Sequence, residues 1–405
     1  MDGIKLFIEN NQLVAFVIIV GIYAMGDAIG TASKAWIPST FVIACLFLLG
    51  YWTIFPKEII AIAGLKKPLI GTLSLFLLVT HMGTTISLKE LKKQWKIIVV
   101  TLTGLVGMLV FAWVICSFFI EKPYIIAGLP SLAGGIVAAV TMQEAAASKG
   151  MEVAAVLAIA MYSIQGFVGY PLTAIILKKE GNRLIKDYRE GNPIESEVEL
   201  IEKKSERKKI IKPTPDKYFS TAVALTKLAI IATLAMFIGQ WTGGWGYFKI
   251  NGIVAALIMG IVFTEIGFLE KDILKKCGCF NLIALFVMLY IFDGLKGASI
   301  EILSSAIFPM VSLIGFGVSG MVIVSIFVSR ALKISPLIGI GASLTALYGF
   351  PPNFVLTNEA SNAIAKDEEE KEYLMKHMLP QMIVGGFVTV TITSVIIAGI
   401  FANLL

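Results

Sequence analysis

Apolar residues dominate this chain in long uninterrupted runs, and the runs decide which fold the sequence predicts. Each of ten runs is about 20 residues long, enough for a helix to cross a hydrocarbon core of ~30 Å. They cover residues 12–31, 38–56, 69–86, 97–120, 152–178, 218–241, 250–268, 280–296, 303–329 and 378–404. The pattern therefore predicts an all-α polytopic membrane protein with ten spanning helices.

Two further apolar stretches are too broken for plain spanning helices. The stretch 124–148 contains Pro130 and two consecutive glycines, and the stretch 334–365 contains Gly349 and two consecutive prolines. Glycine and proline release backbone groups that lipid cannot satisfy, so such a stretch must be buried in protein or line a water-filled cavity. We expect a re-entrant hairpin at each of them.

The two halves of the chain match each other in order. Overlaying them pairs Ser87 with Ser299, Gly107 with Gly320, Pro123 with Pro336, Gly128 with Gly341, Gly134 with Gly349, Glu144 with Glu359 and Phe167 with Phe387. The offset grows only from 212 for the first pair to 220 for the last. An ordered series of this kind indicates a duplicated membrane unit. The expected organisation is a repeat over 1–178, a charged linker over 179–217 and a second repeat over 218–405, each repeat having five helices and one hairpin.

The distribution of positive charge gives this organisation an orientation. Four lysines lie between Lys89 and Lys96, and the segment 178–217 carries twelve Lys or Arg beside nine acidic residues. The positive-inside rule assigns both segments to the cytoplasm, which requires 124–148 to enter and return on one side. Five crossings per repeat is an odd number, so we expect the repeats to be inverted and both termini to be external.

Two features leave alternatives open. Lys57, Lys66 and Lys67 would lie outside in this topology, against the rule. The linker 179–217 is either a solvated, partly helical connection or a segment with a lipid-headgroup or regulatory role.

Composition agrees with a multi-pass protein of the plasma (cytoplasmic) membrane. Apolar residues make up 57% of the chain, mean hydropathy is +0.84 and only 15% of residues are charged, against about 25% in soluble domains. The first apolar run has no A-x-A-like site close behind it, so we interpret it as a helix and not as a cleaved signal. The four cysteines form neither a disulfide framework nor a zinc site.

Each broken stretch carries a glutamate at the matched position, Glu144 in the first and Glu359 in the second. An ionisable side chain inside a bilayer costs several kcal/mol, so a matched pair predicts a functional site. We expect both glutamates to bind or exchange a coupling ion, Na⁺ or H⁺. The alternative is that each lies at the aqueous end of its hairpin and is solvated there.

His81 and Asp293 form a second matched pair, at equivalent points of two apolar helices. Ionisable residues inside a membrane must be paired, hydrated or part of a functional site, and a histidine can also exchange a proton near neutral pH. We assign them to ion coupling, with a location near the membrane interface as the alternative. Asp27 and Glu265 have no matched partners and are expected to be peripheral.

The hairpins also supply the candidate groups for binding a solute. Unwound carbonyls can coordinate a cation, and the N-terminus of a half-helix can hold an anion. The candidate residues are Ser131, Gly134, Gly135, Thr141, Gln143, Gly349, Asn353, Thr357 and Asn358. No arginine lies within a predicted span, which favours a monocarboxylate or an amino acid over a tricarboxylate.

The first hairpin, Ser131-Leu-Ala-Gly-Gly135, is similar to the Ser- and Gly-rich hairpin of the sodium:glutamate symporters. The layout as a whole also resembles the 2-hydroxycarboxylate transporters and the wider superfamily that includes the bile acid symporters. The second hairpin departs from the paired-glycine pattern between Tyr348 and Asn353. The resemblance implies a homodimeric symporter, coupled to sodium or protons, in which a core with both hairpins moves against a dimerising scaffold in an elevator mechanism.

The sequence therefore predicts a secondary active transporter, with sodium-coupled symport of a small carboxylate or amino acid as the leading function. A proton-coupled or uncoupled permease or exporter of a small organic solute is the alternative, and a channel would differ by lacking saturable, gradient-dependent transport. No H-E-x-x-H, Asp-rich prenyl-diphosphate or G-x-S-x-G motif is present, so we expect no enzyme. We also expect no cofactor, no resident metal other than Na⁺ near Glu144 and Glu359, and no nucleic-acid partner.

Overall fold

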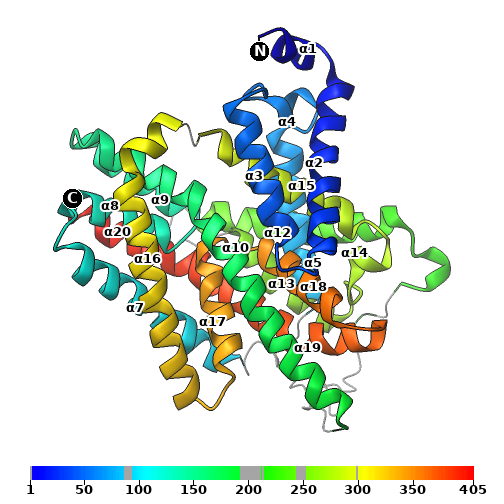
Figure 1. Cartoon of the computed structure of the whole chain (residues 1–405). Coiled ribbons are helices and arrows are strands. Elements are labelled where there is room, and N and C mark those ends of the chain that lie inside the picture. The colour runs from blue at the N-terminus through cyan, green and yellow to red at the C-terminus, as the bar shows by residue number, and fades with distance from the viewer. Residues whose placement is uncertain (1, 86–93, 192–210, 212–213, 243–251, 298–299) are drawn as a thin grey trace. The chain divides into compact units, whose positions relative to one another are not determined.

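The computed structural model describes residues 2–85, 94–191, 211, 214–242, 252–297 and 300–405 (Figure 1). Regular structure in these ranges is entirely helical. The predicted pair Ser87 and Ser299, the lysines from Lys89 to Lys93 and most of the linker lie outside the described residues.

The chain divides into two compact units. Unit 1 comprises Met1–Ile59, Gln94–Ile194 and Gly294–Leu405, and unit 2 comprises Ile60–Lys93 and Glu195–Asp293. Each unit draws on both halves of the sequence, so the compact units do not coincide with the repeats expected over 1–178 and 218–405.

The helices of unit 1 are α1 (Asp2–Glu9), α2 (Gln12–Ala32), α3 (Ser39–Trp52), α7 (Trp95–Cys116), α8 (Lys122–Leu132), α9 (Ile136–Ser148), α10 (Glu152–Arg189), η3 (Gly294–Gly297), α16 (Ile300–Ala331), α17 (Pro336–Leu344), η4 (Thr345–Leu347), α18 (Pro352–Ile364), α19 (Glu368–Phe387), η5 (Val388–Thr393) and α20 (Ser394–Ala402). Those of unit 2 are η1 (Pro68–Leu73), α5 (Ser74–Thr85), η2 (Asp216–Tyr218), α12 (Thr221–Thr242), α13 (Gly252–Ile266), α14 (Ile273–Lys276) and α15 (Phe280–Asp293). The short α4 (Ile59–Ile62) falls on the boundary between them.

Seven helices within the described residues are long and apolar enough to cross a membrane. They are Gln12–Ala32, Pro68–Thr85, Trp95–Cys116, Glu152–Arg189, Thr221–Thr242, Phe280–Gly297 and Ala306–Ala331. Two of the ten predicted spans, 38–56 and 250–268, correspond to the shorter α3 and α13. The last, 378–404, is the end of the nearly continuous series α19, η5 and α20. The fold is thus that of an all-helical polytopic membrane protein.

The longest helix, α10, organises unit 1 and is the long green helix of Figure 1. It has 38 residues and continues past position 178 to Arg189, so the first residues of the predicted linker are helical. It packs against both broken stretches, against α8 and α9 and against α17 and α18.

Helices α7 and α16 make the most extensive helix pair of unit 1. They cross at Gly107 and Gly320, where each backbone meets the other. A methyl group on Gly107 would lie 2.9 Å from the carbonyl oxygen of Gly320, and one on Gly320 would lie 2.5 Å from that of Gly107. Small residues permit this approach, which is how helices gain contact area where lipid supplies no hydrophobic driving force.

Candidate functional site

The first broken stretch consists of two helical arms that lie on the N-terminal half of α10. In α8, Gly128 faces Leu157 and Met161. The break follows, and the carbonyl oxygen of Gly134 accepts a hydrogen bond of 3.1 Å from Gln165 Nε2. The returning arm α9 then packs with the first turns of α10, in a cluster that includes Met142. Both arms therefore leave the break toward the same end of α10.

The second broken stretch lies in the opposite way, on the C-terminal half of α10. Ser335, just before α17, donates a hydrogen bond of 2.7 Å to Glu180. Ile364, at the end of α18, faces Gly181. Between these ends, the break brings the Tyr348 hydroxyl within 2.8 Å of Thr173 Oγ1. The two breaks thus reach α10 from opposite ends and meet near its middle.

Val390 lies between the two breaks. A Cβ on Gly135 would lie 3.0 Å from Val390 Cγ1, and a Cβ on Gly349 would lie 3.1 Å from Val390 Cγ2. Val390 belongs to η5, a π-helical turn of the last helix, and such turns occur frequently at functional sites. Gly349 has a φ of +66°, a conformation that favours glycine. Gly134, in turn, packs against Ser394.

Gln165 contributes a polar atom that sequence analysis did not identify. Its side chain is only 2% exposed, and its Nε2 is fixed by the bond to the Gly134 carbonyl. Its Oε1 is buried and has no hydrogen-bond partner among the described residues. An acceptor left in this way is costly unless a donor or a cation completes it. Gln165 is therefore a ready ligand for a cation beside the first break.

The region of the breaks is polar without being ionised. Positions 131–139, 165–173, 345–355 and 388–394 contain no Asp, Glu, Lys, Arg or His. Gly135 precedes α9 in an extended conformation with no side-chain cap, and its carbonyl oxygen accepts from the N–H groups of Ala138 and Ala139. The positive end of the α9 dipole therefore lies at the first break without a side-chain cap, which suits an anion. At the second break, Asn353 N–H donates to the Gly349 carbonyl and Phe354 N–H donates to the Pro351 carbonyl.

The other residues predicted for the site on the first broken stretch lie on its two arms, α8 and α9. Gln143 and Glu144 are exposed on α9, and Thr141 is partly buried. Ser131 is fully buried and donates to the Ala127 carbonyl of its own helix. Gly134, Gly135 and Gly349 are thus the predicted residues that the structure brings together around η5.

On the second arm, the predicted polar residues support the helix itself. Asn353 is fully buried and donates 2.9 Å to the Met382 carbonyl of α19. Thr357 donates to the Asn353 carbonyl, and Asn358 is half-buried. Asn353 therefore fixes the break against α19.

Glu359 has a specific environment that its counterpart Glu144 lacks. Its carboxylate accepts hydrogen bonds from both the backbone N–H and the hydroxyl of Ser39, the first residue of α3. Asp27 of α2 also lies close to this serine. Asp27, expected to be peripheral, thus belongs to the same cluster as Glu359.

His81 and Asp293 both belong to unit 2, and His81 is fully buried. The Nδ1 of His81 accepts a hydrogen bond of 3.3 Å from the Leu274 N–H, and Thr84 Oγ1 lies at the same distance. Asp293 is not among the partners of the ring. The histidine therefore holds the start of α14 against α5, and the predicted pairing with Asp293 gains no support from these contacts.

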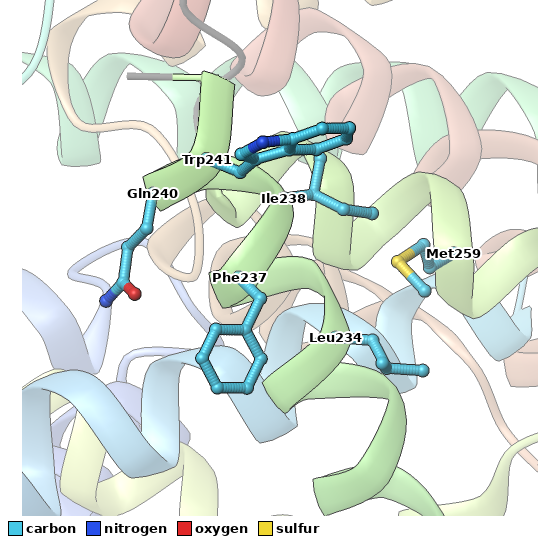
Figure 2. Close-up of a pocket in the computed structure, with 6 residues that line it drawn as sticks. All are labelled: Leu234, Phe237, Ile238, Gln240, Trp241 and Met259. Carbon is cyan, nitrogen blue, oxygen red and sulfur yellow. The ribbon is translucent and has the colours of Figure 1, made fainter. Parts of the chain in front are cut away.

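An open depression of about 660 Å³ lies on unit 2. Figure 2 shows its lining side chains, which are Leu234, Phe237, Ile238, Gln240, Trp241 and Met259. Trp241 is 69% exposed and Phe237 56%. Apart from Gln240 the lining is apolar, as expected of a surface that faces lipid, so the breaks of unit 1 are the better candidate site.

No protein-family model matches this chain, and no curated protein matches it. Among solved structures, it is similar to the sodium proton antiporter MjNhaP1 from Methanocaldococcus jannaschii at pH 8. That match has a TM-score of 0.42 and 18% sequence identity, and it covers 97% of this chain and 99% of that chain. The neighbour is a transporter and not an enzyme.

Proposed function

We propose that this protein is a secondary active transporter that binds a small organic solute between the two breaks and a monovalent cation at Gln165. The observation that carries the proposal is the meeting of Gly135 and Gly349 at Val390, on the middle of α10. Interrupted helices that meet at the midplane of the bilayer are the usual way in which transporters expose backbone groups to substrate and ion.

The positions of the breaks along α10 support the re-entrant interpretation. Gln165 lies thirteen residues after Glu152, about 20 Å at 1.5 Å per residue. That places the first break well inside a ~30 Å hydrocarbon core. The opposite approach of the second break, together with the contact between the matched residues Gly107 and Gly320, supports two repeats of inverted orientation. With the lysine-rich segments in the cytoplasm, the first broken stretch enters from outside and returns there through α9. The second enters from the cytoplasm and returns there through α18.

The chemistry at the breaks favours a solute with a single carboxylate. The N-terminus of α9, which has no side-chain cap, is suited to one anionic group. Positions 131–139, 165–173, 345–355 and 388–394 contain no ionised side chain that could neutralise further charge. Gln165 Oε1 can complete the coordination of Na⁺ together with backbone carbonyls. A monocarboxylate or an amino acid in symport with Na⁺ fits these groups.

Both broken stretches belong to unit 1. A mechanism of the elevator type requires the two hairpins to move together, and one compact unit meets that requirement. Assembly as a homodimer stays a prediction from the resemblance.

Uptake into proteoliposomes tests the proposal. We expect saturable accumulation of a labelled amino acid or monocarboxylate under an inward Na⁺ gradient, and little accumulation with choline in place of Na⁺. A thermal-shift screen of the purified protein identifies the solute first, because a ligand of the native state raises its stability. Flux that never saturates, or that is the same in Na⁺ and choline, would contradict coupled transport at this site.

A further inference from the structure

The carboxylate of Glu359 is bound at the start of a helix from another part of unit 1. Ser39 is the first residue of α3, and its N–H donates to Glu359 Oε2 at 3.1 Å while its hydroxyl donates to Oε1. The first N–H groups of a helix lack intrahelical acceptors. Glu359 therefore joins α18 to α3 through one serine, 320 positions away in the sequence.

A second carboxyl group reaches the same serine. Asp27 belongs to the part of α2 that packs on this serine, since a Cβ on Gly26 would lie 3.2 Å from the Ser39 carbonyl oxygen and one on Gly30 would lie 3.2 Å from Ser39 Cβ. Its carboxyl group lies close enough to act on Ser39 and on the charge of Glu359. A hydroxyl carries one hydrogen and can donate it to only one carboxylate. If Ser39 donates to Glu359, Asp27 can bond to the Ser39 oxygen only by donating a hydrogen of its own.

We propose that Asp27, Ser39 and Glu359 form a proton-binding site in which the two carboxyl groups share one dissociable proton through the serine hydroxyl. In the loaded state the Asp27 carboxyl donates to Ser39 Oγ, and Ser39 donates to the Glu359 carboxylate. Release of the proton leaves two negative charges about a single hydroxyl. Like charges at this distance disfavour the doubly ionised state, which is how paired carboxyl groups come to hold one proton between them.

The neighbouring titratable groups on α2 and α10 supply no charge that would pair with either carboxyl group. Tyr23 on α2 lies close enough to both Asp27 and Tyr170 of α10 to feel their charges. Tyr23 and Tyr170 are phenols, which are neutral near neutral pH. Lys178 of α10 is engaged elsewhere, since its ammonium donates 2.6 Å to the Lys34 carbonyl and stands over the Trp36 ring at 4.1 Å.

Among the described residues, no lysine or arginine forms an ion pair with Asp27 or Glu359; on α19, Lys371 pairs with Glu368 and Lys376 with Glu372. Glu359 is the single ionisable residue of α18, and α3 has only Cys45 and Tyr51, which lie further along that helix. On α19, Glu370 is paired with Arg189, and His377 bonds to the Tyr373 carbonyl. Among the described residues, the hydrogen bonds of Glu359 come only from Ser39.

The positions of Asp27 and Glu359 determine how a proton reaches the pair and which helix contact its release weakens. Asp27 is exposed at the surface of unit 1, whereas Glu359 is half-buried behind it, so a proton reaches the pair from the Asp27 side. After deprotonation, the carboxylates of Asp27 on α2 and Glu359 on α18 repel each other. This repulsion weakens the polar contact that holds the second broken stretch against α2 and α3. This role in transport rests on the proposed function, whereas the proton itself can be measured without any solute.

Infrared difference spectroscopy on the purified full chain tests the site, because a protonated carboxyl and a carboxylate absorb at different frequencies. We expect the wild type at neutral pH to show a carboxylic-acid C=O band that disappears in one step as pH rises. Asp27→Asn and Glu359→Gln should each lose this band, and the double variant should lose no more. The matched control is Glu144→Gln, which removes the exposed counterpart on the first broken stretch and should keep the band.

A band that persists in either single variant would overturn the proposal, since the proton would then belong to the remaining carboxyl alone. Ser39→Ala covers the case in which the acidic variants fail to fold. It keeps both carboxyl groups but removes the bridge, so the band must titrate at a different pH, and an unchanged titration also overturns the proposal. Proteoliposome uptake separates the two hypotheses, because a wild type that shows the band but no solute uptake contradicts only the proposed function.

Discussion

Gly107 of α7 and Gly320 of α16 lie with each backbone against the other, at the crossing of the two helices. We expect Gly107→Ala and Gly320→Ala each to lower the free energy of unfolding by about 1–3 kcal/mol, because the added methyl has no space. Thermal unfolding of the purified protein in detergent measures the effect, with loss of monodispersity as the readout. Gly315→Ala is the control on α16, since nothing lies within 4 Å of a Cβ there, and equal losses at Gly315 and Gly320 would contradict the close crossing.

Gln165→Leu should abolish stabilisation by sodium. The substitution removes both the bond to the Gly134 carbonyl and the buried Oε1. The lost hydrogen bond by itself costs about 1 kcal/mol of stability, so the relevant readout is the difference in melting temperature between NaCl and choline chloride. Gln143→Leu, on the exposed face of α9, is the matched control and should keep the sodium shift. A sodium shift that survives in Gln165→Leu and disappears in Gln143→Leu would restore the assignment made from sequence.

Cysteine labelling tests the opposite approach of the two broken stretches. With Cys45, Cys116, Cys277 and Cys279 replaced, we expect a membrane-impermeant maleimide to label Lys149→Cys from outside and Asp187→Cys from inside. Lys149 ends α9 at the N-terminal end of α10, and Asp187 lies near its C-terminal end. A permeant maleimide should label both, as a control for exposure. Labelling of both from one side would rule out the proposed topology.

The ion pair of Arg189 and Glu370 predicts a pH dependence of stability outside the membrane. Arg189 donates two hydrogen bonds of 2.6 Å to Glu370, and this holds the pKa of Glu370 at about 2, below its ordinary 4.5. A lowered pKa means that the pair stabilises the fold above about pH 4.5 and that this contribution is lost as pH falls toward 2. Glu370→Gln should therefore lower the melting temperature at pH 7, with the difference from wild type shrinking below pH 4.5.

The control for that prediction is Glu190→Gln. Glu190 pairs with Lys186 at 3.8 Å, and both side chains are largely exposed. Exposed pairs contribute about 0–1 kcal/mol, so its melting temperature should stay close to that of wild type at every pH. A gap for Glu370→Gln that is constant from pH 7 to pH 3 would show that the ionised pair is not its cause.

The breaks could be predicted from sequence because glycine and proline act locally. The interruption of a helix at Gly134 or Pro351 follows from the backbone of those residues and their neighbours. The predicted stretches 124–148 and 334–365 accordingly match the limits of α8 with α9 and of α17 with α18. Helix ends near the linker were less predictable, because the linker was expected to be partly helical but its charge pattern did not indicate that α10 would extend to Arg189.

The polar partners could not be predicted, because they come from distant positions. Glu144 and Glu359 occupy equivalent places in the sequence, yet only Glu359 has a Ser39 beside it, and that contact spans 320 positions. Gln165 lies in an apolar run as a single polar residue, and its partner is a backbone carbonyl that has no sequence signature. His81 likewise bonds to a backbone N–H of α14.

The close approach of the two breaks along α10 determines how the protein would sense membrane voltage. Gln165 and Gly169, which contact the first and the second break, are four residues apart, about 6 Å along the helix. If water follows each hairpin to its break, the electrical insulation between the two compartments is reduced to this layer. An ion that crosses 6 Å would then experience almost the whole membrane potential, about 2.3 kcal/mol per elementary charge at 100 mV. A small displacement at the breaks would thus be sufficient to make a transport cycle strongly voltage-dependent.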